Sequence, residues 1–249
     1  MAAESWLTAR PIAHRGLHDK ARGVIENSPA AALAAIAGRY AIECDVQLSS
    51  DGEALVFHDF TLDRLTAEKG RLRARKAAEL SAIGLTGSDD RIPTLAAFID
   101  LIAGRVPLVV EIKSLFDGDM ALTTRALEIV AVRKQWPIVV KSFDPRIVAE
   151  VRRLAPSVTR GIVAMNDYNY PDYKHLSAEE RHAMANLLHF RETRPDFISW
   201  RVRDLPSAAP FLTRGALDLP LMTWTVRTPE DRAKATAYAD QMVFEGFTP

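Results

Sequence analysis

The sequence predicts a (β/α)₈ barrel of the TIM type, with a small insertion after its third strand. Nine short apolar runs rich in β-branched residues recur along the 249-residue chain, and segments with helical spacing separate most of them. The runs are apolar throughout rather than alternating, which is typical of parallel strands covered by helices. Eight or nine strands in about 250 residues fit a closed barrel better than an open sheet.

The predicted elements follow one another in regular order. The strands are expected at residues 11–14, 41–46, 54–58, 108–112, 138–141, 161–164, 197–200, 221–226 and 241–244. The clearest helices are expected at residues 30–37, 94–103, 122–132, 146–154 and 229–239. Ser28-Pro29 and Thr228-Pro229 each place an N-cap residue before a proline at the first helical position, so two of these helices have a defined start.

Residues 60–93 interrupt the alternation of strands and helices. Their central part, residues 71–85, begins with basic residues and predicts a helix, but no strand is evident there. We therefore expect one barrel domain, residues 1–249, that carries an insertion at about 60–93. The chain has no G-x-G-x-x-G after its first strand and no G-x-x-x-x-G-K-[ST], which argues against a nucleotide-binding open sheet.

Composition excludes several classes of protein. The chain has 32 Lys and Arg against 32 Asp and Glu, so its charge indicates neither a nucleic-acid partner nor an anionic membrane surface. Cys44 is the only cysteine, which excludes an internal disulfide and a cysteine-based zinc site. No apolar run approaches the ~18 residues of a membrane span. We expect a soluble cytoplasmic protein without stable membrane insertion, and the sequence does not indicate its oligomeric state.

Asp51-Gly52 predicts a hairpin with one polar face. Asp-Gly between two apolar segments is a strong turn signal, and with these as the two loop residues Asp45 lies opposite His58. Glu43 shares their face because side chains alternate along a strand. Two carboxylates suit a hard cation such as Mg²⁺ or Ca²⁺. The alternative is an exposed hairpin whose polar face is simply solvated.

Two other predicted strands end in residues that fit the same site. Glu111 ends an apolar strand and is the candidate third carboxylate, with Lys113 on the same side, although the two could simply form a salt bridge. His14 and Arg15 follow the first strand. The planar guanidinium of arginine suits a phosphate, and a pair of imidazoles suits proton transfer near neutral pH. Active sites of such barrels lie at the carboxyl ends of the strands.

As a set, these motifs resemble those of the glycerophosphodiester phosphodiesterase family. The N-terminal pattern is present as His14-Arg15-Gly16, Glu26-Asn27-Ser28, Glu43-Cys44-Asp45, Asp51-Gly52 and His58-Asp59. It continues as Ile92-Pro93-Thr94-Leu95, Glu111-Ile112-Lys113, Ser142-Phe143-Asp144-Pro145 and Trp224-Thr225-Val226. The motifs keep the order of the family over nearly the whole chain, which makes the set specific.

The resemblance implies a (β/α)₈ barrel that hydrolyses glycerophosphodiesters to glycerol 3-phosphate and an alcohol, in glycerol and lipid metabolism. It implies a divalent cation, Mg²⁺ or Ca²⁺, held by Glu43, Asp45 and Glu111. The implied acid–base pair is His14 and His58. In the family the attacking group is the glycerol hydroxyl of the substrate, which gives a cyclic phosphate that water then opens.

The resemblance also implies which residues bind the substrate. Arg15 and Lys113 would bind the phosphate. Trp224 and Phe143 lie at strand ends, where each either contacts the substrate or packs in the core or rim. The tyrosine-rich segment 165–173 is expected to form a long loop at the same end of the barrel, while His175 and the remaining histidines are expected to be structural or solvated.

The chain departs from the family pattern at five positions, the first of which is Ile25, where the family often has Pro. Glu245 and Phe247 stand where the family usually has Asp and Pro, and Lys141 and Arg227 add two cations that we expect near the mouth. Such cations favour an anionic diester such as glycerophosphoinositol or glycerophosphoglycerol. Two alternative functions remain: a lysophospholipase D or sphingomyelinase D-like activity on lipid, and a non-catalytic phosphodiester-binding protein on the same barrel.

Overall fold

Nine strands form one continuous sheet in the computed structural model, which describes residues 5–249. They are β1 (Ile12–Ala13), β2 (Ala41–Leu48), β3 (Ala54–Val56), β4 (Leu108–Ile112), β5 (Ile138–Ser142), β6 (Arg160–Ala164), β7 (Phe197–Arg201), β8 (Leu221–Val226) and β9 (Gln241–Phe244). Each corresponds to a strand predicted from the sequence, with ends that differ by at most two residues.

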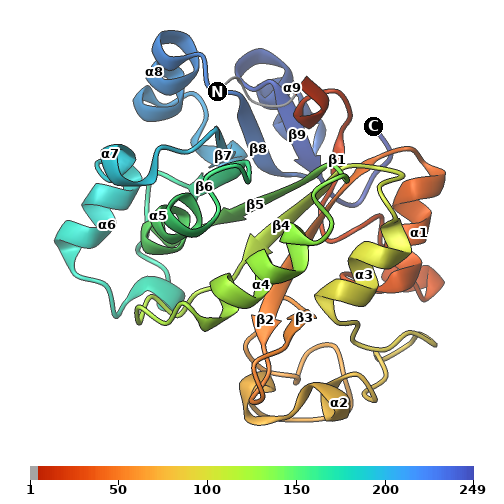
Figure 1. Cartoon of the computed structure of the whole chain (residues 1–249). Coiled ribbons are helices and arrows are strands. Elements are labelled where there is room, and N and C mark those ends of the chain that lie inside the picture. The colour runs from red at the N-terminus through yellow and green to blue at the C-terminus, as the bar shows by residue number, and fades with distance from the viewer. Residues whose placement is uncertain (1–4) are drawn as a thin grey trace.

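Within the described residues, eight parallel strands close into a barrel (Figure 1). The order around it is β1-β9-β8-β7-β6-β5-β4-β2, and β1 pairs in parallel with β2 to complete the ring. The remaining strand, β3, is antiparallel to β2 and lies at the bottom of Figure 1 with α2 (Ala77–Leu80), away from the two chain ends at the top. The predicted (β/α)₈ fold class is confirmed.

Helices surround the barrel and bury the outward faces of the strands (Figure 1). Besides α2 they are α1 (Pro29–Ala37), α3 (Leu95–Ile102), α4 (Ala121–Ala131), α5 (Pro145–Leu154), α6 (Ala178–Ala185), α7 (Phe190–Thr193), α8 (Ala208–Leu217) and α9 (Pro229–Tyr238). The cap signals are confirmed, because the side chains of Ser28 and Thr228 accept backbone hydrogen bonds at the starts of α1 and α9. The described part of the chain has no helix long and apolar enough to cross a membrane.

Side chains inside the barrel follow a two-residue alternation that separates an apolar layer from a polar one. The apolar residues are Ile12, Ala41, Val109, Val139, Phe197, Met222 and Val243, which pack together with Leu7. Two positions further along the chain come Glu43, Glu111, Lys141, Ser199 and Trp224 on the same strands, with His14 and Glu245 directly after β1 and β9. Since side chains of a strand alternate between faces, these residues also point inward. The carboxyl ends of the strands are therefore the polar end of the barrel interior.

Gly161 on β6 keeps space for one member of the apolar layer. A Cβ atom at this position would lie 2.2 Å from the ring of Phe197, its register partner on β7. On its other side Gly161 pairs with Lys141 of β5. The flank of Lys141 that faces β6 is thus glycine backed by an aromatic ring.

The segment between β3 and α3 packs in a second apolar cluster together with Ile25 and Leu55. It contains one short 3₁₀ turn, Leu72–Ala74, and α2, with turns and isolated bridges elsewhere. A helix over the whole of residues 71–85 is therefore wrong. The buried residues of this cluster are Ile25, Leu55, Phe57, Leu62, Leu65, Leu72, Leu80, Ile83, Leu85 and Ile92.

The predicted register of the β2–β3 hairpin is wrong by one residue. Val46 pairs with Val56, and the backbone N–H of Phe57 donates to the carbonyl oxygen of Asp45 at 2.9 Å, so Phe57 rather than His58 lies opposite Asp45. The loop has three residues, Ser50, Asp51 and Gly52, rather than two. Gly52 adopts a left-handed φ of 83° in this turn. His58 lies beyond the end of β3.

Candidate active site

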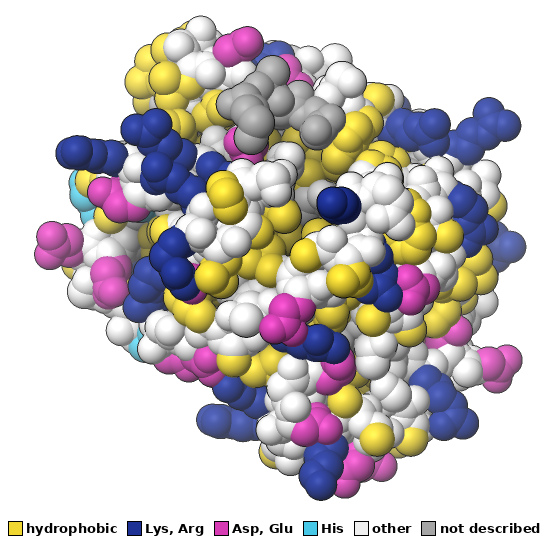
Figure 2. Space-filling model, in the orientation of Figure 1, with side chains coloured by type: hydrophobic (Ala, Val, Ile, Leu, Met, Phe, Trp, Pro, Cys, Tyr) yellow, Lys and Arg dark blue, Asp and Glu magenta, His cyan; other side chains and the backbone are white. Residues whose placement is uncertain are grey.

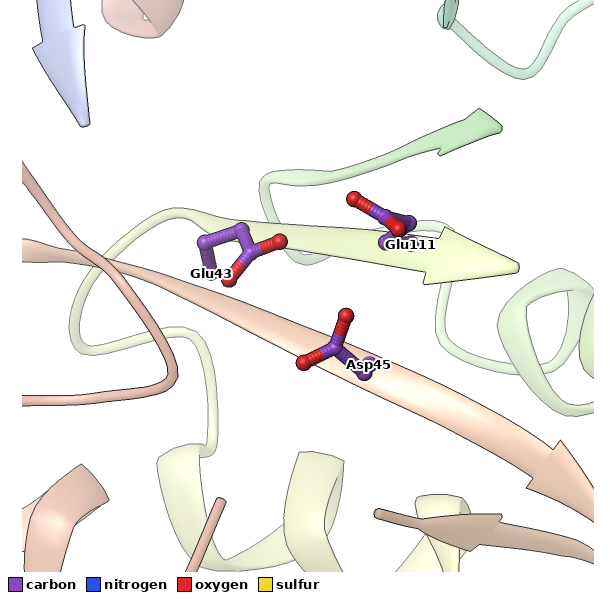
Figure 3. Close-up of side chains that lie close together, drawn as sticks. All are labelled: Glu43, Asp45 and Glu111. Carbon is purple, nitrogen blue, oxygen red and sulfur yellow. The ribbon is translucent and has the colours of Figure 1, made fainter. Parts of the chain in front are cut away.

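Three carboxylates meet inside the polar end of the barrel. Glu43 and Asp45 project from β2, and Glu111 projects from β4 as the register partner of Asp45 (Figure 3). One oxygen from each lies within 4.8 Å of the others. The residues are 0%, 1% and 5% exposed, respectively. The structure thus brings together the three residues predicted to bind metal.

Two lysines neutralise this cluster from opposite sides. The ammonium of Lys113 lies 2.7 Å from Asp45 Oδ1 and 2.5 Å from Glu111 Oε1. The ammonium of Lys141 lies 2.9 Å from Glu43 Oε1 and 3.3 Å from Glu111 Oε2. Burial by itself would raise the pKa of Asp45, but the charge of Lys113 holds it well below its usual range. Burial would likewise lower the pKa of each lysine, yet the carboxylates raise both.

The carboxylate cluster fits a hard divalent cation. All of its donor atoms are carboxylate oxygens, which Mg²⁺ and Ca²⁺ prefer. Glu43 Oε1 is buried and has the ammonium of Lys141 at 2.9 Å as its counter-charge. Three buried carboxylates that meet in one place need positive charge beside them, which a bound divalent cation can supply together with the lysines. Glu43, Asp45 and Glu111 could therefore hold one.

Each of the two predicted catalytic histidines is held by its own carboxylate. His14 Nδ1 lies 2.6 Å from Glu245 Oε2, and His58 Nδ1 lies 2.7 Å from Asp59 Oδ1. Burial would raise the pKa values of Glu245 and Asp59, but the hydrogen bonds from the histidines, with those from Arg227 and Arg64, keep both well below their usual range. An ionised carboxylate only accepts hydrogen bonds, so each Nδ1 carries the proton and each Nε2 is the atom free to exchange one.

Arg15 connects the first strand to the carboxylate cluster. Its guanidinium donates to Glu26 at 2.7 Å and lies 3.2 Å from Asp45 Oδ2, while its backbone N–H donates to Glu43 at 3.1 Å. Burial would raise the pKa of Glu26, but hydrogen bonds from Arg64 and Arg15 lower it to about 2. Arg15 borders the cavity described next, and its binding to phosphate remains a prediction.

A cavity of about 670 Å³ opens above the cluster at the carboxyl ends of the strands. Eight of the nine predicted site residues line it, namely His14, Arg15, Asp45, His58, Glu111, Lys113, Phe143 and Trp224. Glu43, the ninth, is completely buried in the cluster. The structure therefore gathers the whole predicted set, from both halves of the chain, at one place.

One wall of the cavity is aromatic. The rings of Phe143 and Trp224 meet edge to face at 5.3 Å, and Tyr173 lies 6.1 Å from Phe143 and 5.7 Å from Phe116. Phe116, Tyr173 and His175 line the cavity but were not predicted as site residues. The tyrosine-rich loop was the one signal for Tyr173. Nothing in the sequence separates Phe116 or His175 from ordinary loop residues.

The two additional cations lie differently from what the sequence predicts. Lys141 borders the cavity floor, is 3% exposed and binds the carboxylate cluster, so its expected place at the mouth is wrong. Arg227 is exposed at the cavity and donates to Glu245 at 2.9 Å. Both charges are therefore engaged by carboxylates. Lys and Arg are interspersed with Asp and Glu over the face in Figure 2.

Comparison with known proteins shows similarity to one family over most of the chain. The profile of the Glycerophosphoryl diester phosphodiesterase family matches residues 14–244. A glycerophosphodiester phosphodiesterase of Caldanaerobacter subterraneus is 32% identical over 163 residues, which cover 61% of this chain and 65% of that relative. The match thus spans slightly less than two thirds of the relative's length. A putative glycerophosphodiester phosphodiesterase of Bacillus subtilis is 29% identical, over 74% of this chain and 76% of its own length.

Solved structures show the same architecture. A putative glycerophosphoryl diester phosphodiesterase from Silicibacter pomeroyi is 26% identical and superposes with a TM-score of 0.72, over 94% of this chain and 89% of its own. A phosphodiesterase from Oleispira antarctica, solved with its product sn-glycerol-3-phosphate, has a TM-score of 0.75 at 21% identity, over 97% of this chain and 95% of its own. At that identity, the second structure shows the fold alone.

Proposed function

The chain belongs to the glycerophosphoryl diester phosphodiesterase family, whose members are phosphoric diester hydrolases, and from this premise we propose that it hydrolyses glycerophosphodiesters to glycerol 3-phosphate and an alcohol. The observation that carries the proposal is the buried carboxylate cluster beneath a cavity that also holds two carboxylate-bound histidines. The substrate is a small molecule.

We propose that the reaction depends on a divalent cation, Mg²⁺ or Ca²⁺, held by Glu43, Asp45 and Glu111. When bound, the cation would supply positive charge that stabilises the negative charge growing on the phosphoryl oxygens. Lys113 would add a second positive charge, because it borders the cavity and contacts Asp45 of the cluster. Arg15 would orient the same phosphate through its guanidinium.

We propose that His14 and His58 move the protons of the reaction. One neutral Nε2 removes the proton from the attacking glycerol hydroxyl while the P–O bond to the alcohol breaks, and the other imidazole, protonated, gives its proton to the departing oxygen. Water then opens the resulting cyclic phosphate with the two roles reversed. The carboxylates of Glu245 and Asp59 hold the rings in place and stabilise the imidazolium forms.

The aromatic wall and the rim of the cavity favour one second candidate. Phe143 and Trp224 would contact the alkyl parts of the substrate, and two rim residues, Phe60 and Leu115, are 41% and 45% exposed. Exposed apolar side chains beside a site suit a lipid chain. A lysophospholipase D activity on the same carboxylates is therefore the alternative. A binding-only protein would have no use for two histidines that are each held by a carboxylate.

One product assay separates these functions. The purified protein is incubated, with Mg²⁺ and in parallel with Ca²⁺, with glycerophosphocholine, glycerophosphoethanolamine, glycerophosphoinositol and lysophosphatidylcholine. The products measured are glycerol 3-phosphate, lysophosphatidate and the free alcohols. We expect glycerol 3-phosphate from the three soluble diesters. Lysophosphatidate alone would assign the lipid activity, and the absence of every product would contradict hydrolysis.

A further inference from the structure

Lys141 is a cation enclosed by the same carboxylates that are proposed to bind metal. It lies on β5 next to Glu111 in the register of the barrel, and its ammonium bridges Glu43 and Glu111. Lys113 bridges Asp45 and Glu111 in the same manner. The two lysines and the guanidinium of Arg15 therefore match the negative charges of the three carboxylates.

The two lysines differ in what else they can reach. Lys113 follows the end of β4, and its side chain is 14% exposed where it borders the cavity. It can exchange a carboxylate for the phosphate of a substrate. The side chain of Lys141 also borders the cavity, at its floor, but it is only 3% exposed and starts inside a strand. On the β6 side Lys141 lies next to Gly161 and the ring of Phe197, which offer no polar side chain. Among the described residues, the ion-pair partners of its ammonium are Glu43 and Glu111.

We propose that Lys141 is a permanent counter-ion of the metal site, one that positions Glu43 and Glu111 and lowers the affinity of the site for divalent cations. This inference rests on the proposed metal site but not on the identity of the substrate. A cation that enters the cluster meets the ammonium of Lys141 beside two of its three ligand residues. Two like charges a few ångströms apart in a buried site repel strongly.

The ion pairs of Lys141, which would weaken metal binding, are expected to stabilise the fold of the metal-free protein. Without Lys141, Glu43 would be a fully buried carboxylate, and no other side chain of residues 5–249 forms an ion pair with its Oε1 atom. A buried charge that loses its partner destabilises a protein substantially. Lys141 therefore makes the fold independent of the metal while weakening the binding of the metal. Removing the lysine reverses both properties.

The test is a calorimetric titration of the folded protein with Mg²⁺ alone and Ca²⁺ alone, on wild type and on Lys141→Met. Methionine is unbranched like lysine and only one heavy atom shorter, and it carries no charge. We expect the variant to bind Mg²⁺ or Ca²⁺, or both, with an affinity at least about tenfold higher than that of the wild type. We also expect its thermal midpoint without metal to fall, and added metal to raise that midpoint more than in wild type.

Arg160→Met is the matched control. Arg160 is a buried cation at the start of β6 that lies 3.5 Å from Asp196, outside the carboxylate cluster. Its loss is expected to lower the thermal midpoint without changing the affinity for metal. The control separates the loss of a buried cation in general from the loss of this one.

Equal or weaker metal binding by folded Lys141→Met would overturn the proposal, and so would a variant that stays unfolded at saturating Mg²⁺ and Ca²⁺. If the variant stays unfolded with metal present, the ammonium of Lys141 is required for folding even when a cation occupies the site. A variant that folds only with metal supports the proposal. Because binding is measured directly, a wild-type protein that binds metal but releases no glycerol 3-phosphate contradicts the proposed reaction and leaves this inference standing.

Discussion

Replacing His14 or His58 by alanine is expected to lower the turnover of a glycerophosphodiester by about 10²- to 10⁴-fold in each case. Both imidazoles line the cavity, and each has a carboxylate on Nδ1 that leaves Nε2 as the atom that exchanges a proton. The loss is expected in kcat more than in KM, because proton transfer contributes to the transition state. Steady-state kinetics on purified variants measure the split.

His182→Ala is the matched control for these two variants. His182 is an exposed residue of α6 and is expected to leave kcat unchanged. Circular dichroism and thermal melts show whether each variant is folded. A folded His14→Ala or His58→Ala enzyme with wild-type turnover would remove that histidine from the mechanism.

Glu111→Gln is expected to reduce kcat/KM by at least about 100-fold and to weaken divalent cation binding in parallel. Glu111 contacts both lysines and lies across from Asp45, so it is the central member of the cluster. Replacing a residue that only supports a metal ligand typically lowers metal affinity or activity 10- to 100-fold. Because Glu111 is proposed to bind the metal itself, we expect its replacement to cost at least as much. Calorimetry and kinetics on the same preparation test both effects.

Asp144→Asn controls for the loss of a buried carboxylate elsewhere. Asp144 is 0% exposed and caps α5 by accepting the backbone N–H of Arg146, and asparagine retains an acceptor oxygen there. We expect metal affinity close to wild type in this variant. If Glu111→Gln also bound Mg²⁺ and Ca²⁺ as wild type does, Glu111 would not be a ligand.

The strand pattern explains why so much of the site could be predicted from the sequence. Residues such as Val109 and Glu111 are two apart on one strand, so an apolar core residue and a functional residue necessarily share the barrel interior. The carboxyl ends of parallel strands then collect the polar residues at one end. Short motifs distant in the sequence thereby specify one site.

What could not be predicted depends on geometry outside the strands. The hairpin register changes with a single residue, since Ser50 lengthens the loop, and the sequence signal of Asp51-Gly52 does not distinguish two loop residues from three. The helices α6, α7 and α8 were not expected from the sequence; α7 has only four residues, and α8 contains Pro210 and Gly215.

Lys141 shows a different limit of the sequence. Its two-residue spacing from Val139 places it on the inner face of β5, but a lysine is long enough to reach either the mouth or the centre of a barrel. Only the register with Glu111 shows that its charge is taken up by carboxylates. The cations near the site consequently give no basis for an anionic head group.

The most direct test of the account is glycerol 3-phosphate release from glycerophosphocholine, glycerophosphoethanolamine and glycerophosphoinositol by the wild-type protein, before and after treatment with EDTA. We predict release from these diesters, its loss with EDTA, and its recovery when Mg²⁺ or Ca²⁺ is added back. Release that continues undiminished after EDTA removes all bound divalent cation would contradict the assignment of Glu43, Asp45 and Glu111 as an essential metal site.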